Sequence, residues 1–223
     1  MRKIAAALVF LTAVPAVVTA QDADRSVAGG GITAAGWKGK IDSKAAKAGK
    51  TVNDSKFAMT GGKLELKIGP AATYWNDANK ASGNYEVKAS FTENKHNPGH
   101  PHSYGIVIGG SDLGTESQAY AYCIVYADGK YAAKYFHGET VADLAPRTES
   151  AAVKKAVDGV ATNEIGWKVA GDKASCVING QTVQTWDKAA LVGADKLKSL
   201  DGVYGIRVTH NVDLTVTPLK LSK

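Results

Sequence analysis

Three histidines lie in one short polar segment of the chain and suggest metal chemistry. The segment reads TENKHNPGHPHS and contains His96, His100 and His102. Imidazole is a common ligand of zinc and copper, and an extended backbone would point His100 and His102 the same way. A closed zinc site needs four ligands, and no cysteine is nearby. The segment is therefore either a metal site on these histidines or a polar loop at the rim of the fold, and no other cofactor is expected.

Carboxyl groups in a pair would indicate glycoside hydrolysis. A retaining glycosidase holds two of them about 5 Å apart, and an inverting enzyme holds them further apart. The acidic residues of the predicted strands occur singly between apolar residues: Glu65, Glu86, Glu164 and Asp213. This pattern favours solvated charges, although carboxyl groups from separate strands can converge. The chain also lacks a Gly-x-Ser-x-Gly elbow and a phosphate-binding loop, so no catalytic residue is predicted.

Aromatic side chains are the third chemically useful group. A sugar ring stacks its apolar face on them while its hydroxyl groups bond to polar neighbours. The predicted ligand-binding residues are Trp75, Tyr104, Tyr120, Tyr122, Tyr126, Lys134 and Arg207. The competing interpretation is that most of these side chains belong to the core.

The orientation of three of these tyrosines depends on the hairpin around Asp128-Gly129. A two-residue turn would place Lys130 and Lys134 on the core face. A three-residue loop, with glycine in the left-handed region, turns both lysines outward. Burying an unpaired lysine is expensive, so we prefer the longer loop. The outward face then also carries three tyrosines that we expect to be exposed as the main ligand platform: Tyr120, Tyr122 and Tyr126.

Short strands are the elements that must position these residues. Segments rich in Val, Ile, Tyr and Trp alternate with the turn pairs Asp-Gly, Gly-Asp and Asn-Gly, which is typical of antiparallel sheets. Strands are predicted near 64–68, 85–91, 104–109, 118–127, 130–137, 163–170, 173–179 and 181–186. A short helix is predicted at Ser150–Val157, and residues 203–209 and 212–217 are predicted to close the chain as a hairpin around His210-Asn211. Together these elements indicate one all-β domain.

The only two cysteines, Cys123 and Cys176, are both expected in the core. The hairpin around Gly171-Asp172 pairs Cys176 with Trp167 on an apolar face, and the preferred tyrosine register turns Cys123 inward. A disulfide between them is compatible with an exported protein. Two buried thiols that pack as small hydrophobic groups are the alternative, and the sequence leaves both open.

The order of these motifs carries a resemblance to a known superfamily. It runs from TYW at 73–75 through HPHSYGIVIGG at 100–110, AYCIVYADGKYAAKYFHG at 121–138 and NEIGWKVAGDKASCVINGQTV at 163–183 to GVYGIRVTHNVDLTV at 202–216. The chain resembles small secreted bacterial proteins of the concanavalin A-like lectin/glucanase superfamily, close to the 3-keto-disaccharide hydrolase domain and to laminin G-like domains. The resemblance implies a jelly-roll sandwich of two antiparallel sheets, often with a sugar-binding concave face. The Glu-x-Asp-x-x-Glu string of the superfamily's glucanases is absent.

The first twenty residues are predicted to be a signal peptide. Arg2 and Lys3 precede an apolar run from Ile4 to Val18, and small residues lead to a cleavage point after Ala20. We expect a flexible lead-in at 21–36 and the β-sandwich domain at 37–223. The formal net charge is +6 with dispersed lysines, which argues against nucleic acid as a partner. The predicted location is secreted or periplasmic, without membrane insertion after cleavage.

Three functions from different classes follow from these observations. The first is a non-catalytic, lectin-like protein that binds a glycan or polysaccharide. The second is a glycoside-cleaving enzyme that uses dispersed carboxylates or a metal, so enzymatic activity is left open. The third is a structural or protein-interaction domain of the cell envelope.

Overall fold

The computed structural model describes residues 22–223 as two β-sheets packed face to face. The predicted signal peptide lies outside the described residues. The seven-stranded sheet consists, in spatial order, of β10 (Thr140–Glu149), β9 (Lys130–His137), β8 (Ala119–Tyr126), β7 (Ser103–Ser111), β14 (Gly202–Val208), β5 (Ala72–Ala81) and β2 (Trp37–Ile41). The nine-stranded sheet consists of β1 (Gly31–Ile32), β3 (Lys56–Thr60), β4 (Lys63–Lys67), β15 (Asp213–Val216), β6 (Tyr85–Glu93), β11 (Ala161–Ala170), β12 (Lys173–Ile178) and β13 (Gln181–Asp187), with β16 (Lys220–Ser222) also paired to β6.

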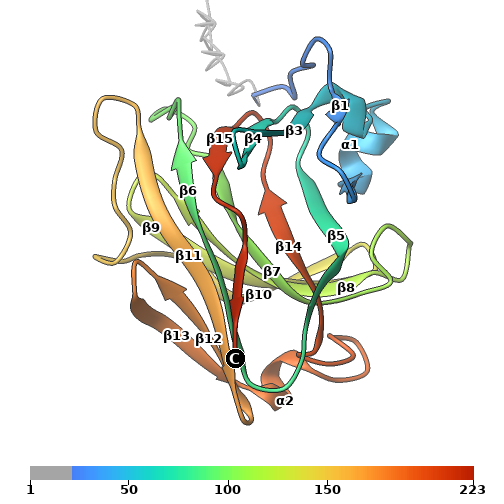
Figure 1. Ribbon diagram of the computed structural model, residues 1–223, viewed down its shortest axis with the longest axis vertical. Helices are drawn as coiled ribbons and strands as arrows, with labels where there is room; N and C mark the ends of the chain where they lie inside the picture. The colour runs from blue at the N-terminus through green and yellow to red at the C-terminus, as the bar shows by residue number, and fades with distance from the viewer. Residues whose placement is uncertain (1–21) are drawn as a thin grey trace, which may run out of the picture.

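This architecture is the predicted all-β jelly-roll sandwich. Strand pairing is antiparallel throughout the named strands except between β1 and β3. Among the described residues, two short α-helices, α1 (Ser43–Lys47) and α2 (Lys188–Leu191), lie at opposite ends of the sandwich (Figure 1). A 3₁₀ turn at Val52–Asp54 follows α1. Within residues 22–223, none of the helices has the length and apolar character needed to cross a membrane.

The main core lies between the two sheets and contains both cysteines. Trp167 of β11 is fully buried, and its Nε1–H donates a hydrogen bond to the carbonyl of Ile106 on β7, 3.1 Å away. Cys123 of β8 and Cys176 of β12 form a disulfide with a Cα–Cα distance of 6.1 Å. This bond therefore links the two sheets covalently through the core.

The predicted hairpin registers are confirmed. Tyr126 pairs with Lys130, and Tyr122 pairs with Lys134, as the three-residue loop requires. Gly129 has a φ of 94°, in the left-handed region that glycine adopts without a steric penalty. In the next hairpin, Trp167 pairs with Cys176 as predicted.

The predicted hairpin of residues 203–217 is wrong, because its two strands belong to different sheets. β14 pairs with β5 and β7 in the seven-stranded sheet, whereas β15 pairs with β4 and β6 in the other sheet. Both strands carry buried apolar residues, and they face each other across the core instead of pairing edge to edge. The connection between them, His210-Asn211, therefore crosses from one sheet to the other at one end of the sandwich.

The predicted helix at Ser150–Val157 is also wrong. Its backbone groups bond to other parts of the chain: Lys154 N–H donates to Asn163 Oδ1 and Ala156 N–H donates to the Ala127 carbonyl, both at 2.8 Å. These bonds engage backbone N–H groups that a helix would use internally, and Ala152 and Val153 are buried against the core. The segment therefore forms turns instead of a helix. β10, a mostly exposed edge strand without clear alternation, was not predicted.

The ordered chain begins before Trp37, where the sequence predicts the domain to start. Gly31–Ile32 forms β1 beside β3. Arg25 Nε–H donates to the Ile68 carbonyl at 2.8 Å, and Asn211 Nδ2 donates to the Ala23 carbonyl at 2.8 Å. These bonds hold residues 23–25 against the connection between β14 and β15.

Candidate functional site

The outer face of the seven-stranded sheet carries a second, smaller apolar cluster. Its aromatic members are Tyr120 and Tyr122 of β8 and Phe136 of β9. The rings of Tyr120 and Phe136 stack with centroids 4.9 Å apart, and the ring of Tyr122 lies 5.9–6.0 Å from both. The predicted face of the tyrosines is thus confirmed, and it points away from the main core.

The expectation that Tyr120 and Tyr122 are exposed on this face is wrong. Their exposed fractions are 1% and 3%. Leu113, from the loop between β7 and β8, packs against the cluster, and the guanidinium of Arg207 lies 5.6 Å from the Tyr122 ring centroid. Tyr120 also shares a 2.7 Å hydrogen bond with Thr73 Oγ1. These tyrosines form a covered aromatic layer.

Arg207 is held in this layer by the carboxylate of Asp42. Its two Nη atoms donate to the two carboxylate oxygens at 2.6 Å and 2.5 Å, in a bidentate pair. Burial alone would lower the pKa of Arg207, but the neighbouring Asp42 carboxylate raises it, so the guanidinium stays charged. Because Asp42 immediately precedes α1, the ion pair fixes the start of this helix over the sheet.

The remaining predicted ligand-binding residues lie in three different environments. Tyr104 is fully buried in the main core, stacked on Phe91, and so does not lie on the outer face. Trp75 is on the outer face but is 4% exposed, because the loop at Gly114 lies against its ring. Tyr126 and Lys134 are partly exposed on the outer face.

An accessible strip, called the glycan strip below, runs along the outer faces of β9 and β10 and begins at Tyr126, the last residue of β8. At one end, the guanidinium of Arg147 lies 4.0 Å from the Tyr126 ring centroid. In the middle, Lys134 Nζ lies 2.9 Å from Asp143 Oδ1, and both side chains are partly exposed. The strip therefore places an aromatic ring beside several charged hydrogen-bonding groups.

The strip ends in a pocket of about 500 Å³ between α1 and the hairpin of β9 and β10. Phe136 and Val141 form its apolar part, and Val141 is 43% exposed. An ion pair of 3.5 Å between Lys47 and Glu139 spans the two walls. The residues that line this pocket are Asp42, Ser43, Lys44, Lys47, Phe136, Glu139 and Val141.

Three histidines also converge, but they are not the predicted three. One ring nitrogen from each of His100, His102 and His210 lies within 4.8 Å of the others. His96 is elsewhere: its Nδ1 lies 3.2 Å from Oε1 of Glu93, and its backbone N–H donates to the Gly159 carbonyl. His210 replaces it because the connection between β14 and β15 crosses the same end of the sandwich.

Two carboxylates from the N-terminal segment contact this histidine cluster. Oδ2 of Asp22 lies 3.5 Å from His100 Nδ1 and 3.3 Å from His102 Nε2, and Oδ1 of Asp24 lies 2.9 Å from His210 Nδ1. A hydrogen bond from Asn211 and the three nearby imidazoles lower the pKa of Asp22. Burial and the two other histidines lower the pKa of His102 to about 4, so its imidazole is neutral near pH 7.

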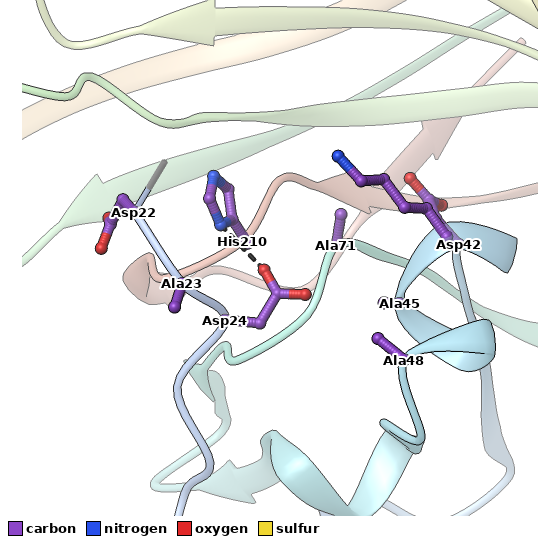
Figure 2. Close-up of a pocket in the computed structure, with 9 residues that line it drawn as sticks. Asp22, Ala23, Asp24, Asp42, Ala45, Ala48, Ala71 and His210 are labelled. Carbon is purple, nitrogen blue, oxygen red and sulfur yellow. Dashed lines mark ion pairs between the residues drawn. The ribbon is translucent and has the colours of Figure 1, made fainter. Parts of the chain in front are cut away.

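A pocket of about 430 Å³ adjoins the cluster and shares Asp42 and Lys44 with the strip pocket. Figure 2 shows Asp22 and Ala23 on one side of it and the start of α1 on the other, with His210 and Ala71 between them. The two pockets thus flank Asp42 at one end of the sandwich.

The four single acids of the predicted strands line neither of these two pockets, whose carboxyl groups come from Asp22, Asp24 and Asp42 in one and from Asp42 and Glu139 in the other. Glu86 and Glu164 both contact Lys88, at 3.8 Å and 3.2 Å, on the outer face of the nine-stranded sheet. Glu65 accepts a hydrogen bond from Thr215, and Asp213 pairs with Arg25. The single strand acids are thus engaged with neighbours of their own sheet or of the N-terminal segment.

Glu93, which is not among the predicted site residues, is a buried carboxyl group. It is 1% exposed, and within residues 22–223 its Oε2 has no hydrogen-bond partner. Burial raises its pKa above the usual 4.5, although His96 opposes the shift. Its place at the end of the alternating pattern of β6 was a signal that its side chain turns inward.

We expect Glu93→Gln to raise the Tm at neutral pH. Because the folded-state pKa is raised, the folded protein binds the proton more tightly than the unfolded chain. The stabilisation from this proton is fully present below the pKa that Glu93 has in the unfolded chain. It is lost as the pH rises through the pKa that Glu93 has in the folded protein. Melting curves of both proteins from pH 4 to pH 8 should therefore converge at the acid end and separate above it.

The exposed Glu149→Gln provides the matched control and should leave the pH dependence of the Tm unchanged. If the Glu93→Gln protein is less stable than the parent at every pH, the prediction is wrong. The contact of the Glu93 carboxylate with His96 then stabilises the fold by more than its burial costs.

Comparison with known proteins extends only to structure. No family model and no curated protein sequence matches the chain. The carbohydrate binding module CBM66 from Bacillus subtilis is similar with a TM-score of 0.56 and 11% identity, over 87% of this chain and 99% of that one. A glycoside hydrolase family 16 endo-glucanase from Bacteroides ovatus is similar with a TM-score of 0.57 and 9% identity, over 83% and 94%.

A third similar structure is a protein of unknown function with a galectin-like fold, also from Bacillus subtilis. Its TM-score is 0.54 at 11% identity, over 83% of this chain and 88% of that one. The fold is thus a jelly-roll sandwich of the kind that the sequence resemblance implied. At these identities the likeness establishes the fold, and the function must be argued from the site.

Proposed function

We propose that the protein is an exported, lectin-like β-sandwich that binds a glycan along the outer face of β9 and β10. The observation that carries the proposal is the accessible strip, where apolar surface and charged hydrogen-bonding groups lie side by side. Tyr126 occupies one end of the strip and the pocket with Phe136 and Val141 occupies the other. Sugar recognition requires this combination, because pyranose rings have an apolar face and a rim of hydroxyl groups.

The covered aromatic layer supports the strip from beneath. Tyr120, Tyr122 and Arg207 lock the outer face of β8 and the start of α1 in place, so the floor of the site is rigid before a ligand arrives. Pre-formed sites lose less conformational entropy on binding. In this proposal, Tyr126 and Lys134 of the predicted set contact the glycan, whereas Tyr120, Tyr122 and Arg207 position the surface. Trp75 and Tyr104 lie away from the strip and take no part.

Export rests on two observations. The N-terminal sequence has the charge and apolar pattern of a signal peptide. The disulfide between Cys123 and Cys176 suits an oxidising compartment. A secreted or periplasmic location follows, and intact-mass analysis of the exported protein should find Gln21 at its N-terminus.

A glycan array combined with a glycosidase screen on the purified protein tests the function. The proposal expects saturable binding to one class of glycan without turnover. Hydrolysis of a bound glycan would support the enzyme instead, and silence in both assays would favour a structural or protein-interaction domain.

We expect Tyr126→Ala and Lys134→Ala each to weaken binding of an array hit by about 1–3 kcal/mol, or about 5- to 150-fold in Kd. Both side chains are partly exposed on the strip, so the Tm should change little. The matched control is Lys168→Ala, an exposed lysine of β11 on the other sheet. Calorimetric titration measures the effect, and an equal loss in the control would place binding elsewhere.

A further inference from the structure

The histidine cluster has the ligand types of a transition-metal site. Its three imidazoles converge, the carboxylate of Asp22 lies near two of them, His100 and His102, and no cysteine belongs to the group. Zinc and neighbouring divalent metals favour imidazole, whereas calcium and magnesium favour sites made entirely of oxygen. The three histidines come from two segments far apart in sequence, so the cluster exists only in the folded chain.

The spacing of the ligand atoms is close to that around a tetrahedral ion. Zinc ligands at about 2.0 Å from the ion lie about 3.3 Å from one another. Asp22 Oδ2 already lies 3.3 Å from His102 Nε2 and 3.5 Å from His100 Nδ1. The histidine nitrogens lie within 4.8 Å of each other, so they would have to approach one another by up to about 1.5 Å around a bound ion. Partly exposed His100 and Asp22 leave the ion a path from solvent.

Asp24 places a carboxylate beside one ring nitrogen of His210, as is usual for a histidine whose other ring nitrogen binds a metal. Its Oδ1 lies 2.9 Å from His210 Nδ1, a buried nitrogen that makes no hydrogen bond within residues 22–223, so the two groups meet as an ion-pair contact. The contact favours a proton on Nδ1 and leaves the lone pair of Nε2 free for a metal. In Figure 2 the second ring nitrogen of His210 points away from Asp24.

We propose that His100, His102, His210 and Asp22 bind one divalent ion of the zinc class, with Asp24 orienting His210. The anchoring bonds of residues 23–25 hold both aspartates in place. The bound ion fastens the N-terminal segment to the crossing between β14 and β15. None of the four proposed ligands lines the pocket of the glycan strip, so either proposal can fail without the other.

Calorimetric titration of chelator-treated full-length protein with Zn²⁺ tests the site. We expect one ion per chain and a rise in Tm of about 5–10 °C at a zinc concentration one hundred times the Kd. Co²⁺ should give the visible absorption of a tetrahedral complex, and Ca²⁺ should not bind.

Variants separate ligands from the orienting residue. Asp24→Asn should weaken zinc binding about 10- to 100-fold, as is typical when a group that contacts a metal ligand, but not the metal, is replaced. His100→Ala and His210→Ala should weaken it further, and partly exposed His100 can be replaced without loss of the fold. The control is His137→Ala on β9, outside the cluster. Absence of saturable binding, or equal losses in His210→Ala and His137→Ala, would overturn the proposal.

Discussion

Replacing both cysteines, Cys123→Ala with Cys176→Ala, should lower the free energy of unfolding by about 4 kcal/mol. The bond closes a loop over a sequence separation of 53 residues, and a cross-link of this span removes that much entropy from the unfolded chain. It also joins the two sheets at the centre of the core. For a chain of this length the Tm should fall by about 8–16 °C. Urea denaturation and thermal melts measure both quantities.

The control for this experiment is the parent protein unfolded with and without a reducing agent. Reduced parent protein should resemble the double variant, because both lack the cross-link. Two thiols that label in unreduced, unfolded parent protein would show that the bond does not form.

Tyr122→Ala should destabilise the fold by about 3–5 kcal/mol, as truncation of a buried aromatic side chain does. The ring is 3% exposed and packs against Tyr120, Phe136 and Arg207. Its removal leaves a cavity beneath a charged guanidinium. Chemical denaturation of the variant measures the loss.

The matched controls are Tyr122→Phe and Tyr126→Ala. The first keeps the ring, and the second removes a partly exposed ring of the same strand, so both should stay within about 1 kcal/mol of the parent. A Tyr122→Ala protein as stable as the parent would mean that the aromatic layer is open to solvent.

The register of the β8–β9 hairpin could be inferred from the sequence because it depends on the burial cost of residues within the hairpin itself. Burying Lys134 without a partner is expensive, and this alone selects the three-residue loop around Gly129. The pairing of Trp167 with Cys176 follows from alternation in the same way. Local patterns therefore sufficed for most strands and for the face on which each tyrosine lies.

The burial of that face depends on contacts that no local pattern contains. Leu113 comes from a loop outside the hairpin, and Arg207, held by Asp42, comes from β14; both reach the two tyrosines only after the chain has folded. Alternation shows which side of a sheet a residue occupies, but not whether another segment lies above it.

The histidine cluster was incompletely predicted for a related reason. His210 belongs with His100 and His102 because β14 and β15 lie in different sheets. Two consecutive strands with regular alternation are as typical of a hairpin within one sheet as of a connection between two sheets. The sequence pattern therefore could not show that the chain crosses between the sheets here. His96, near the others in sequence, turns instead toward the buried Glu93.

Backbone amide NMR shifts during titration with a glycan that the array identifies test the central claim most directly. The glycan-strip proposal predicts that the largest changes map to the outer face of β9 and β10 and to α1, including Lys134, Val141 and Lys47. The outer face of the nine-stranded sheet should remain unchanged. Shifts confined to that opposite face, or saturable binding without any change along the strip, would contradict the proposal.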